Sequence, residues 1–297
     1  MVCYDKLVKS NRYTSRKIVD ILLKFPNIIY NSSPLDIPQS IFKYRKFDDH
    51  WKESVDGITF FSKAAEFNKN DNNDSNFLVN KDYLRDLVYN QLTEQHLNDN
   101  FNGSFIKEEC SKLVEEHVSK IRGNFRIGCF TTVNPLEEYM WNNKDFGDEH
   151  RGFCIEYKVI PEILFPDPII FLPVLYQDEP YDSTPIVKEI IENKSSLYNN
   201  IIPTAYNFIL IKNTRYSKEK EWRIIVTKNR YNKYFDINDC KKNFSKLIKA
   251  IYLGYDYKLA DQTAEKEKYI LSICKKQQIP LYKMRKENFY PQIIYKP

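Results

Sequence analysis

Two glutamates, Glu219 and Glu221, lie two residues apart where a lysine-rich stretch gives way to the apolar run 224–226. Residues i and i+2 of an extended strand project from the same face, so we expect both carboxylates on one side of a strand and Lys220 with Trp222 on the other. Paired carboxylates repel each other unless a cation, a hydroxyl or a ligand lies between them. The pair therefore predicts a nearby partner.

A Glu-x-Glu motif by itself is short and common. Its simplest interpretation is a half-buried edge strand whose acids pair with Arg45, Arg223 or lysines. A functional interpretation needs further polar, cationic or aromatic side chains that could act with the acids. The sequence has three other segments that carry such side chains.

The first place is residues 41–47, where apolar and polar side chains alternate as in a strand. The alternation puts Tyr44 and Arg45 on opposite faces. An arginine on a strand can hold a phosphate or carboxylate through two parallel hydrogen bonds. For Arg45 alone, a surface salt bridge is the favoured alternative because charged side chains are mostly solvated.

The second place is Thr131 and Thr132, which end a predicted strand and precede the Asn-Pro at 134–135. Their hydroxyls can bind a ligand or cap the helix that the proline starts, and we expect capping for at least one of them. That helix carries Tyr139 and Trp141, an aromatic pair that is typical of a core and sometimes forms a stacking wall.

The third place is His150, in a charged loop between Gly147 and Gly152. With only seven glycines in the chain, we expect these two to answer a backbone requirement such as a positive φ. His150 can titrate near neutral pH. The favoured alternative is a loop histidine that is hydrogen-bonded to the neighbouring backbone.

Composition restricts the class of protein. The 297 residues are 42% hydrophobic and 15% aromatic, which indicates a folded globule. The net charge of +5 arises from 45 basic and 40 acidic residues and does not predict nucleic-acid binding. Six cysteines without a Cys-x-x-Cys motif argue against zinc and against a disulfide framework. No run of eighteen apolar residues occurs, so we expect a cytoplasmic protein with neither a metal nor a membrane partner.

The hydrophobic pattern predicts an α+β protein. An N-terminal helix over 5–24 belongs to an extension at 1–40, and a single α+β domain over 41–297 holds a helical insertion at about 77–122. A helical hairpin is expected over 185–213. The remaining predicted elements are strands at 41–47, 57–62, 125–132, 152–157, 169–176, 221–227, 248–253 and 280–284, and a helix at 260–276.

The order of short motifs resembles the bacterial family called Domain of Unknown Function 2971, over about 41–290. The motifs that carry the resemblance lie at residues 41–45, 60–68, 129–132, 140–141, 150–156, 174–176, 219–223 and 251–254. Two positions depart from the family pattern: Lys69-Asn70 stands where Asp-Pro is usual, and the tryptophan expected before the acids is replaced around Arg215-Tyr216.

The order of Tyr/Arg strand, hydroxyl-bearing strand and Glu-x-Glu strand also resembles ADP-ribosyltransferases. That resemblance implies a split antiparallel β core and NAD as the substrate, with a carboxylate stabilising the oxocarbenium character of the broken glycosidic bond. The resemblance implies that Arg45, beside Tyr44, holds the phosphate and that Thr131 or Thr132 contacts the ribose. It implies catalysis by Glu221 with Glu219 as helper. It also implies a nicotinamide pocket walled by Tyr139 and Trp141, with His150 nearby.

Three functions follow as expectations. The first is an NAD-dependent ADP-ribosyltransferase or NAD glycohydrolase, acting as a toxin or antiphage effector on a protein or nucleic-acid acceptor. The second is a non-catalytic sensor module that binds a nucleotide or a partner. The third is a nucleic-acid-processing enzyme, disfavoured because the sequence shows no cluster of metal-ligating carboxylates and no basic stripe with interleaved aromatics. The first requires Arg45 and Glu221 to line one cleft.

Overall fold

The fold was analysed in a computed structural model. It describes residues 2–3, 28–30, 33–34, 37–69, 74–75, 77–95, 108–112, 114–116, 119, 123, 125–160, 170–179, 181–182, 184, 188, 209–227, 241–259 and 263–297. The predicted helix at 5–24 and most of the predicted hairpin at 185–213 lie outside these residues. At the end of the hairpin range, Ile211–Lys212 form a strand, so the helical prediction is wrong there.

The chain divides into two compact units. We call residues 37–62, 126–174 and 215–297 the sheet unit, and residues 1–36, 63–125 and 175–214 the second unit. All the motifs proposed for chemistry lie in the sheet unit.

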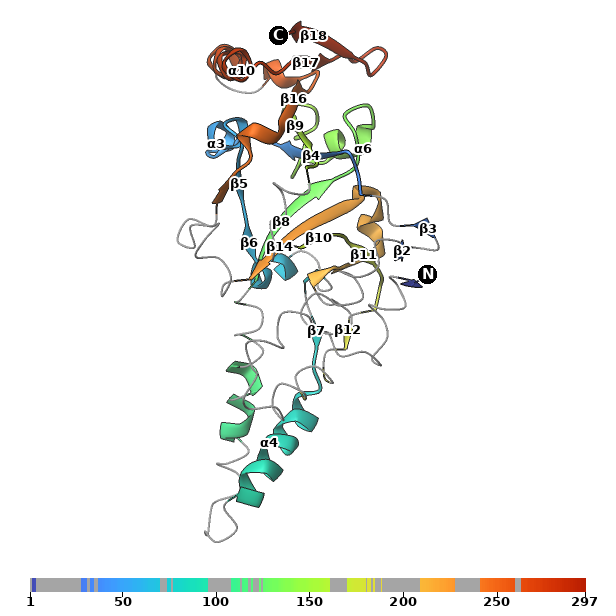
Figure 1. The fold of residues 1–297 in the computed structure, drawn as a ribbon, viewed down its shortest axis with the longest axis vertical. Helices are drawn as coiled ribbons and strands as arrows, with labels where there is room; N and C mark the ends of the chain where they lie inside the picture. Colours follow the sequence, from blue (N-terminus) through green and yellow to red (C-terminus); the bar gives the residue numbers. More distant parts are fainter. Residues whose placement is uncertain are drawn as a thin grey trace. The chain divides into compact units, whose positions relative to one another are not determined.

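The sheet unit is built on a mixed, mostly antiparallel sheet (Figure 1). Its strands lie side by side in the order β10 (Ile170–Pro173), β14 (Glu221–Thr227), β8 (Phe125–Thr131), β4 (Ser40–Arg45), β9 (Phe153–Lys158), β16 (Ile248–Leu253), β17 (Leu281–Met284) and β18 (Pro291–Tyr295). β16 and β17 run parallel because helix α10 (Thr263–Gln277) forms the crossover between them. The sheet confirms the predicted α+β class.

The two faces of this sheet carry different side chains. Face A is defined by Ile41, Phe130, Ile155, Ile224 and Ile251, which share one core cluster. Helices α3 (Trp51–Val55) and α10 contribute Trp51, Val55, Ile270 and Cys274 to the same cluster.

Face B is defined by Phe42, Tyr44, Cys154 and Met284. The short helix α6 (Glu138–Asn142) packs on this face through Met140 and Trp141. Strand alternation therefore assigns each residue of β4 to one face or the other, and it determines which predicted site residues can meet.

The remaining elements of the sheet unit are short. β5 (Ile58–Phe60) pairs antiparallel with β15 (Lys241–Asn243), and the 3-10 helices are η2 (Thr214–Glu219), η4 (Ser245–Leu247) and η5 (Tyr257–Leu259). The chain passes to the second unit at β6 (Ser62–Lys63). The sequence predicted β14 and β16 at their observed bounds and missed β18.

In its described residues, the second unit contains short strand pairs and a long helix. β11 (Leu175–Tyr176) runs parallel to β13 (Ile211–Lys212), and β7 (Phe77–Leu78) runs parallel to β12 (Tyr181–Asp182). η1 (Ala64–Lys69) precedes them, and α4 (Lys81–Gln95) lies in the predicted helical insertion. Near the N-terminus, β1 (Val2–Cys3), β2 (Ile28–Tyr30) and β3 (Ser33–Pro34) form a small sheet. None of the helices described is both long and apolar enough to cross a membrane.

Candidate functional site

The two glutamates that begin the functional hypothesis do not lie on one strand. Glu219 is the last residue of η2, and β14 begins at Glu221. Between them Lys220 has a φ of 44°, in the left-handed region. This residue breaks the alternation of an extended chain, so the prediction that both carboxylates share a strand face is wrong.

Glu221 has a cationic partner on its own strand. Arg223 donates its Nε–H to Glu221 Oε1 over 2.7 Å, and both side chains are buried. The two residues are two apart on β14 and therefore share a face. The pairing with Arg223 is the one named in the simpler sequence interpretation, but β14 lies between β10 and β8 and is not an edge strand.

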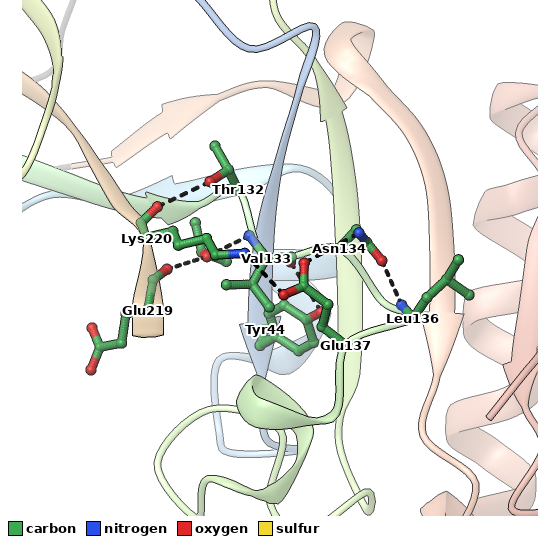
Figure 2. Close-up of polar contacts among 9 residues, drawn as sticks. Tyr44, Thr132, Val133, Asn134, Leu136, Glu137, Glu219 and Lys220 are labelled. Atoms are coloured by element: carbon green, nitrogen blue, oxygen red, sulfur yellow. Dashed lines mark hydrogen bonds and ion pairs between the residues drawn. The ribbon is translucent and has the colours of Figure 1, made fainter. Parts of the chain in front are cut away.

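The threonines hold the turn that precedes β14. Thr131 Oγ1 donates to the carbonyl of Glu219, and both the N–H and the hydroxyl of Thr132 donate to the carbonyl of Lys220, at 3.2 and 3.3 Å. Figure 2 shows the carboxylate of Glu219 pointing away from these contacts. Neither threonine caps α6: its N-cap residue is Glu137, which makes no capping side-chain bond.

A polar cluster fastens the loop between β8 and α6 (Figure 2). Lys220 Nζ pairs with Glu137 Oε2 at 3.0 Å, and Asn134 Nδ2 donates to Glu137 Oε1 at 3.3 Å. Tyr44 donates its hydroxyl to the carbonyl of Val133 at 3.2 Å. Burial raises the pKa of Tyr44, so this hydroxyl remains a hydrogen-bond donor.

The two aromatic residues predicted to form a pocket wall, Trp141 and Tyr139, differ in burial. Trp141 is fully buried, with Tyr44 edge-on to its ring at 5.0 Å, and its indole N–H donates to the carbonyl of Pro135 at 3.0 Å. These contacts give Trp141 the core role. Tyr139 is half-buried, with Lys218 Nζ 6.0 Å from its ring centroid, and can present a ring surface to a ligand.

His150 is enclosed by aromatic rings. Its imidazole stacks on Tyr255 at 3.8 Å and on Trp141 at 5.7 Å, and its Nε2 lies 3.0 Å from Asn142 Oδ1. Its Nδ1 is buried without a hydrogen-bond partner. Burial lowers the pKa of His150 to about 4, so the prediction of titration near neutral pH is wrong.

The glycines around His150 serve close packing and not positive φ. Asp148, Glu149 and His150 adopt φ of 51°, 52° and 66°, whereas among the glycines that the structure describes the positive φ belongs to Gly57. A Cβ on Gly147 would lie 2.4 Å from the Cα of Trp141. The backbone requirement predicted for Gly147 is therefore close packing, because a residue with a Cβ would collide with helix α6.

Arg45 and its neighbour Lys43 form a cationic pair on face A. Arg45 Nη2 bonds Asp48 Oδ2 at 2.9 Å, and the buried Nε–H of Arg45 has no partner. Lys43 Nζ donates to the carbonyl of Cys129 at 3.3 Å and lies 4.9 Å from the ring centroid of Phe130. Burial, reinforced by the charge of Arg45, lowers the pKa of Lys43 to about 8.

Sequence reasoning missed Lys43 as a site residue. The signal was present, since a lysine two residues before Arg45 on a predicted strand shares its face. Its half-buried position and depressed pKa depend on the neighbouring strand β8, which the local pattern does not reveal.

Arg45 and Glu221 are not brought together. β8 lies between their strands, and alternation assigns Arg45 to face A and Glu221 to face B. Phe42 of β4 pairs with Thr131 of β8, so Arg45, three residues further along β4, is level with Gly128. Gly128 lies about 10 Å along β8 from Thr131, the residue that contacts Glu219. The predicted clamp and the predicted acid thus lie on opposite faces, although the charges of both act on Lys43.

Metal ligands are not gathered at any of these positions. Within the part of the chain that the structure describes, no group of three or more His, Cys, Asp or Glu side chains is arranged to hold a metal ion.

Comparison with known proteins gives one match. No curated protein and no solved structure matches the chain significantly. Residues 140–224, which include His150, Glu219 and Glu221, match the model of the family described as Protein of unknown function (DUF2971), and this confirms, within that stretch, the family resemblance that the motifs predicted.

Proposed function

We propose that the sheet unit is a sensor module that binds the phosphate of a nucleotide at Lys43 and Arg45. The observation that carries the proposal is the pair itself: two cations on one face of β4, with an unpartnered Arg45 Nε–H and Asp48 as the carboxylate bonded to Arg45. A planar guanidinium binds phosphate oxygens in pairs, and an ammonium adds a compact second charge.

The electrostatics of Lys43 and Arg45 favour an anion. Burial is the main cause of the lowered pKa of Lys43; the positive charge of Arg45 lowers this pKa further, and Glu221 opposes the shift. A phosphate between them replaces this repulsion with two attractions and supplies an acceptor for the Arg45 Nε–H. The half-buried Lys43 and the 25% exposed side chain of Arg45 leave the pair within reach of a ligand.

Calorimetric titration with NAD, ADP-ribose and AMP tests the proposal. We expect saturable binding by the wild-type protein and at least tenfold weaker binding by Arg45→Gln, in line with the loss of a charge-assisted bond of about 1.5–3 kcal/mol. Arg151→Gln is the matched control, because Arg151 forms an equivalent 2.9 Å pair with Asp148 three residues away. Equal affinities of both variants, or no binding of any of these ligands, would contradict the proposal.

A second candidate is NAD-consuming transfer or hydrolysis, with a toxin or antiphage role. The contact of Thr131 with Glu219 favours it, because the hydroxyl-bearing segment and the acid segment are adjacent as that motif order requires. In this proposal Glu221 supplies the carboxylate and must first part from Arg223. Arg45 lies on the other face of the sheet, so in this candidate a cation other than the predicted clamp holds the dinucleotide phosphate.

Mass spectrometry of NAD and co-incubated protein and nucleic acid distinguishes the two candidates. Nicotinamide release by the wild type and its loss in Glu221→Gln protein that circular dichroism shows to be folded supports catalysis. Saturable NAD binding without any product supports the sensor.

A further inference from the structure

A second polar constellation lies on face B, around Glu156 of β9. Its side chain is 8% exposed, and its oxygens accept three hydrogen bonds. Ser40 Oγ donates to Oε1 at 2.8 Å, Lys249 Nζ donates to Oε1 at 2.6 Å, and Tyr252 Oη donates to Oε2 at 2.8 Å. Lys249 Nζ also lies 3.2 Å from Ser40 Oγ, which closes a triangle of serine, carboxylate and ammonium.

The sheet brings these groups together from three strands. Phe42 of β4 and Ala250 of β16 both lie opposite Glu156. Ser40 precedes Phe42 by two residues and therefore shares its face. The register of β16 shifts between Ile248 and Ala250, at Lys249. Such bulges redirect a side chain and are over-represented next to active sites.

We propose that Ser40 is the nucleophile of an ester-cleaving site in which Glu156 is the general base. The arrangement fits the relation between a nucleophile, a base and a group that orients the base. Glu156 Oε1 accepts the Ser40 hydroxyl, and Tyr252 fixes the other carboxylate oxygen. Lys249 is placed to stabilise the negative charge that develops on Ser40 Oγ.

The reaction balances with water as the co-reactant. Ser40 Oγ bonds to the acyl carbon of an ester while its proton passes to Glu156 Oε1. The ester C–O bond breaks, and the alcohol leaves with that proton. Water then attacks the acyl-serine carbon and gives a proton to Glu156, which returns it to Ser40 Oγ as the carboxylic acid is released.

Two features indicate access and substrate class. Ser40 is half-buried, and the side chain of Lys249 is 49% exposed, so the triangle opens toward solvent on one side. The half-buried rings of Tyr252 and Tyr282 stack at a centroid distance of 5.0 Å beside Glu156. Stacked rings offer a platform to a planar group, which favours aryl esters.

This site is separate from the cationic pair. Ser40 and Arg45 are the first and last residues of β4, five positions apart (45 − 40), or about 17 Å along an extended strand. They also belong to opposite faces. Failure of phosphate binding at Arg45 therefore leaves the proposal for Ser40 unaffected.

Labelling with a fluorophosphonate probe tests the proposal, with peptide mass spectrometry to locate the adduct. We expect the wild-type protein to carry the label on Ser40 and to hydrolyse 4-nitrophenyl acetate. Ser40→Ala should lose the label, and Glu156→Gln, which keeps its hydrogen-bonding shape, should lower the labelling rate on the order of 100-fold. Ser272→Ala removes an exposed hydroxyl elsewhere and should change nothing.

If Ser40 and Glu156 have only a structural role, the opposite labelling results are expected. Absence of label on Ser40 in folded wild-type protein overturns the proposal, and so does equal labelling of wild type and Glu156→Gln. Tyr252→Phe keeps the ring stack and removes the hydroxyl, so it provides a folded variant in which slower labelling reports on the orientation of Glu156. If Glu156→Gln does not fold, labelling of Tyr252→Phe at the wild-type rate counts against the proposal.

Discussion

Arg223 donates its Nε–H to Glu221 Oε1 over 2.7 Å, and both side chains are buried in β14. A buried carboxylate requires compensation, and here it comes from the same strand face two residues later. The carboxylate that the motif order presents as catalytic thus has a structural cation as its partner.

Arg223→Met should destabilise the protein strongly, because it leaves the carboxylate of Glu221 buried without this cation. Removal of one partner of a buried pair costs about 3–5 kcal/mol, whereas replacement of both partners by apolar groups costs much less. Urea unfolding of Arg223→Met and of Glu221→Leu/Arg223→Met measures the difference. A double variant as unstable as the single one would show that the pair is not the source of the loss.

The pH dependence of stability should report on His150. Its folded pKa of about 4 lies below the usual 6.5, so the unfolded chain binds more protons between these values. Stability is therefore complete above pH 6.5 and falls as the pH drops toward 4. The difference of 2.5 units (6.5 − 4) corresponds to a loss of about 3 kcal/mol.

Thermal unfolding of the wild type and of His150→Phe from pH 7 to pH 4 measures this loss. Phe keeps the ring between Trp141 and Tyr255 but cannot be protonated. Glu138, Asp256 and Lys286 also act on the imidazole, and all three residues remain in the variant. Identical slopes in the two proteins would exclude His150 as the cause.

Phosphate binding at Lys43 and Arg45 should weaken above about pH 8. The pKa of Lys43 is lowered to about 8, so its amine loses its charge in that range. A bound phosphate favours the charged amine, and binding near pH 8 should therefore take up a proton. Calorimetry in two buffers with different ionisation enthalpies measures the uptake, which Lys43→Met should abolish. Equal proton uptake in the variant would assign the linkage to another group.

The positions of the strands along the chain could be predicted from the sequence better than the order in which the strands pair in the sheet. Period-two alternation located β14 and separated Tyr44 from Arg45, because both are local properties of the chain. The positions of Arg45 and Glu221 on opposite faces depend on the order β14, β8, β4, which joins segments far apart in sequence. The pKa of His150 depends likewise on burial against Tyr255, a residue more than one hundred positions away.

Gly147→Ala should destabilise the sheet unit through a steric conflict. A Cβ at this position would lie 2.4 Å from the Cα of Trp141 and 2.6 Å from the carbonyl oxygen of Met140, and backbone atoms cannot rotate away. Forced backbone shifts in a packed region cost about 1–3 kcal/mol. Gly123→Ala is the matched control, because a Cβ there meets no atom within 4 Å. Chemical denaturation should show a lower midpoint for Gly147→Ala and a wild-type or higher midpoint for Gly123→Ala. Equal midpoints would show that α6 can move aside, in which case Trp141 does not hold the loop that carries His150.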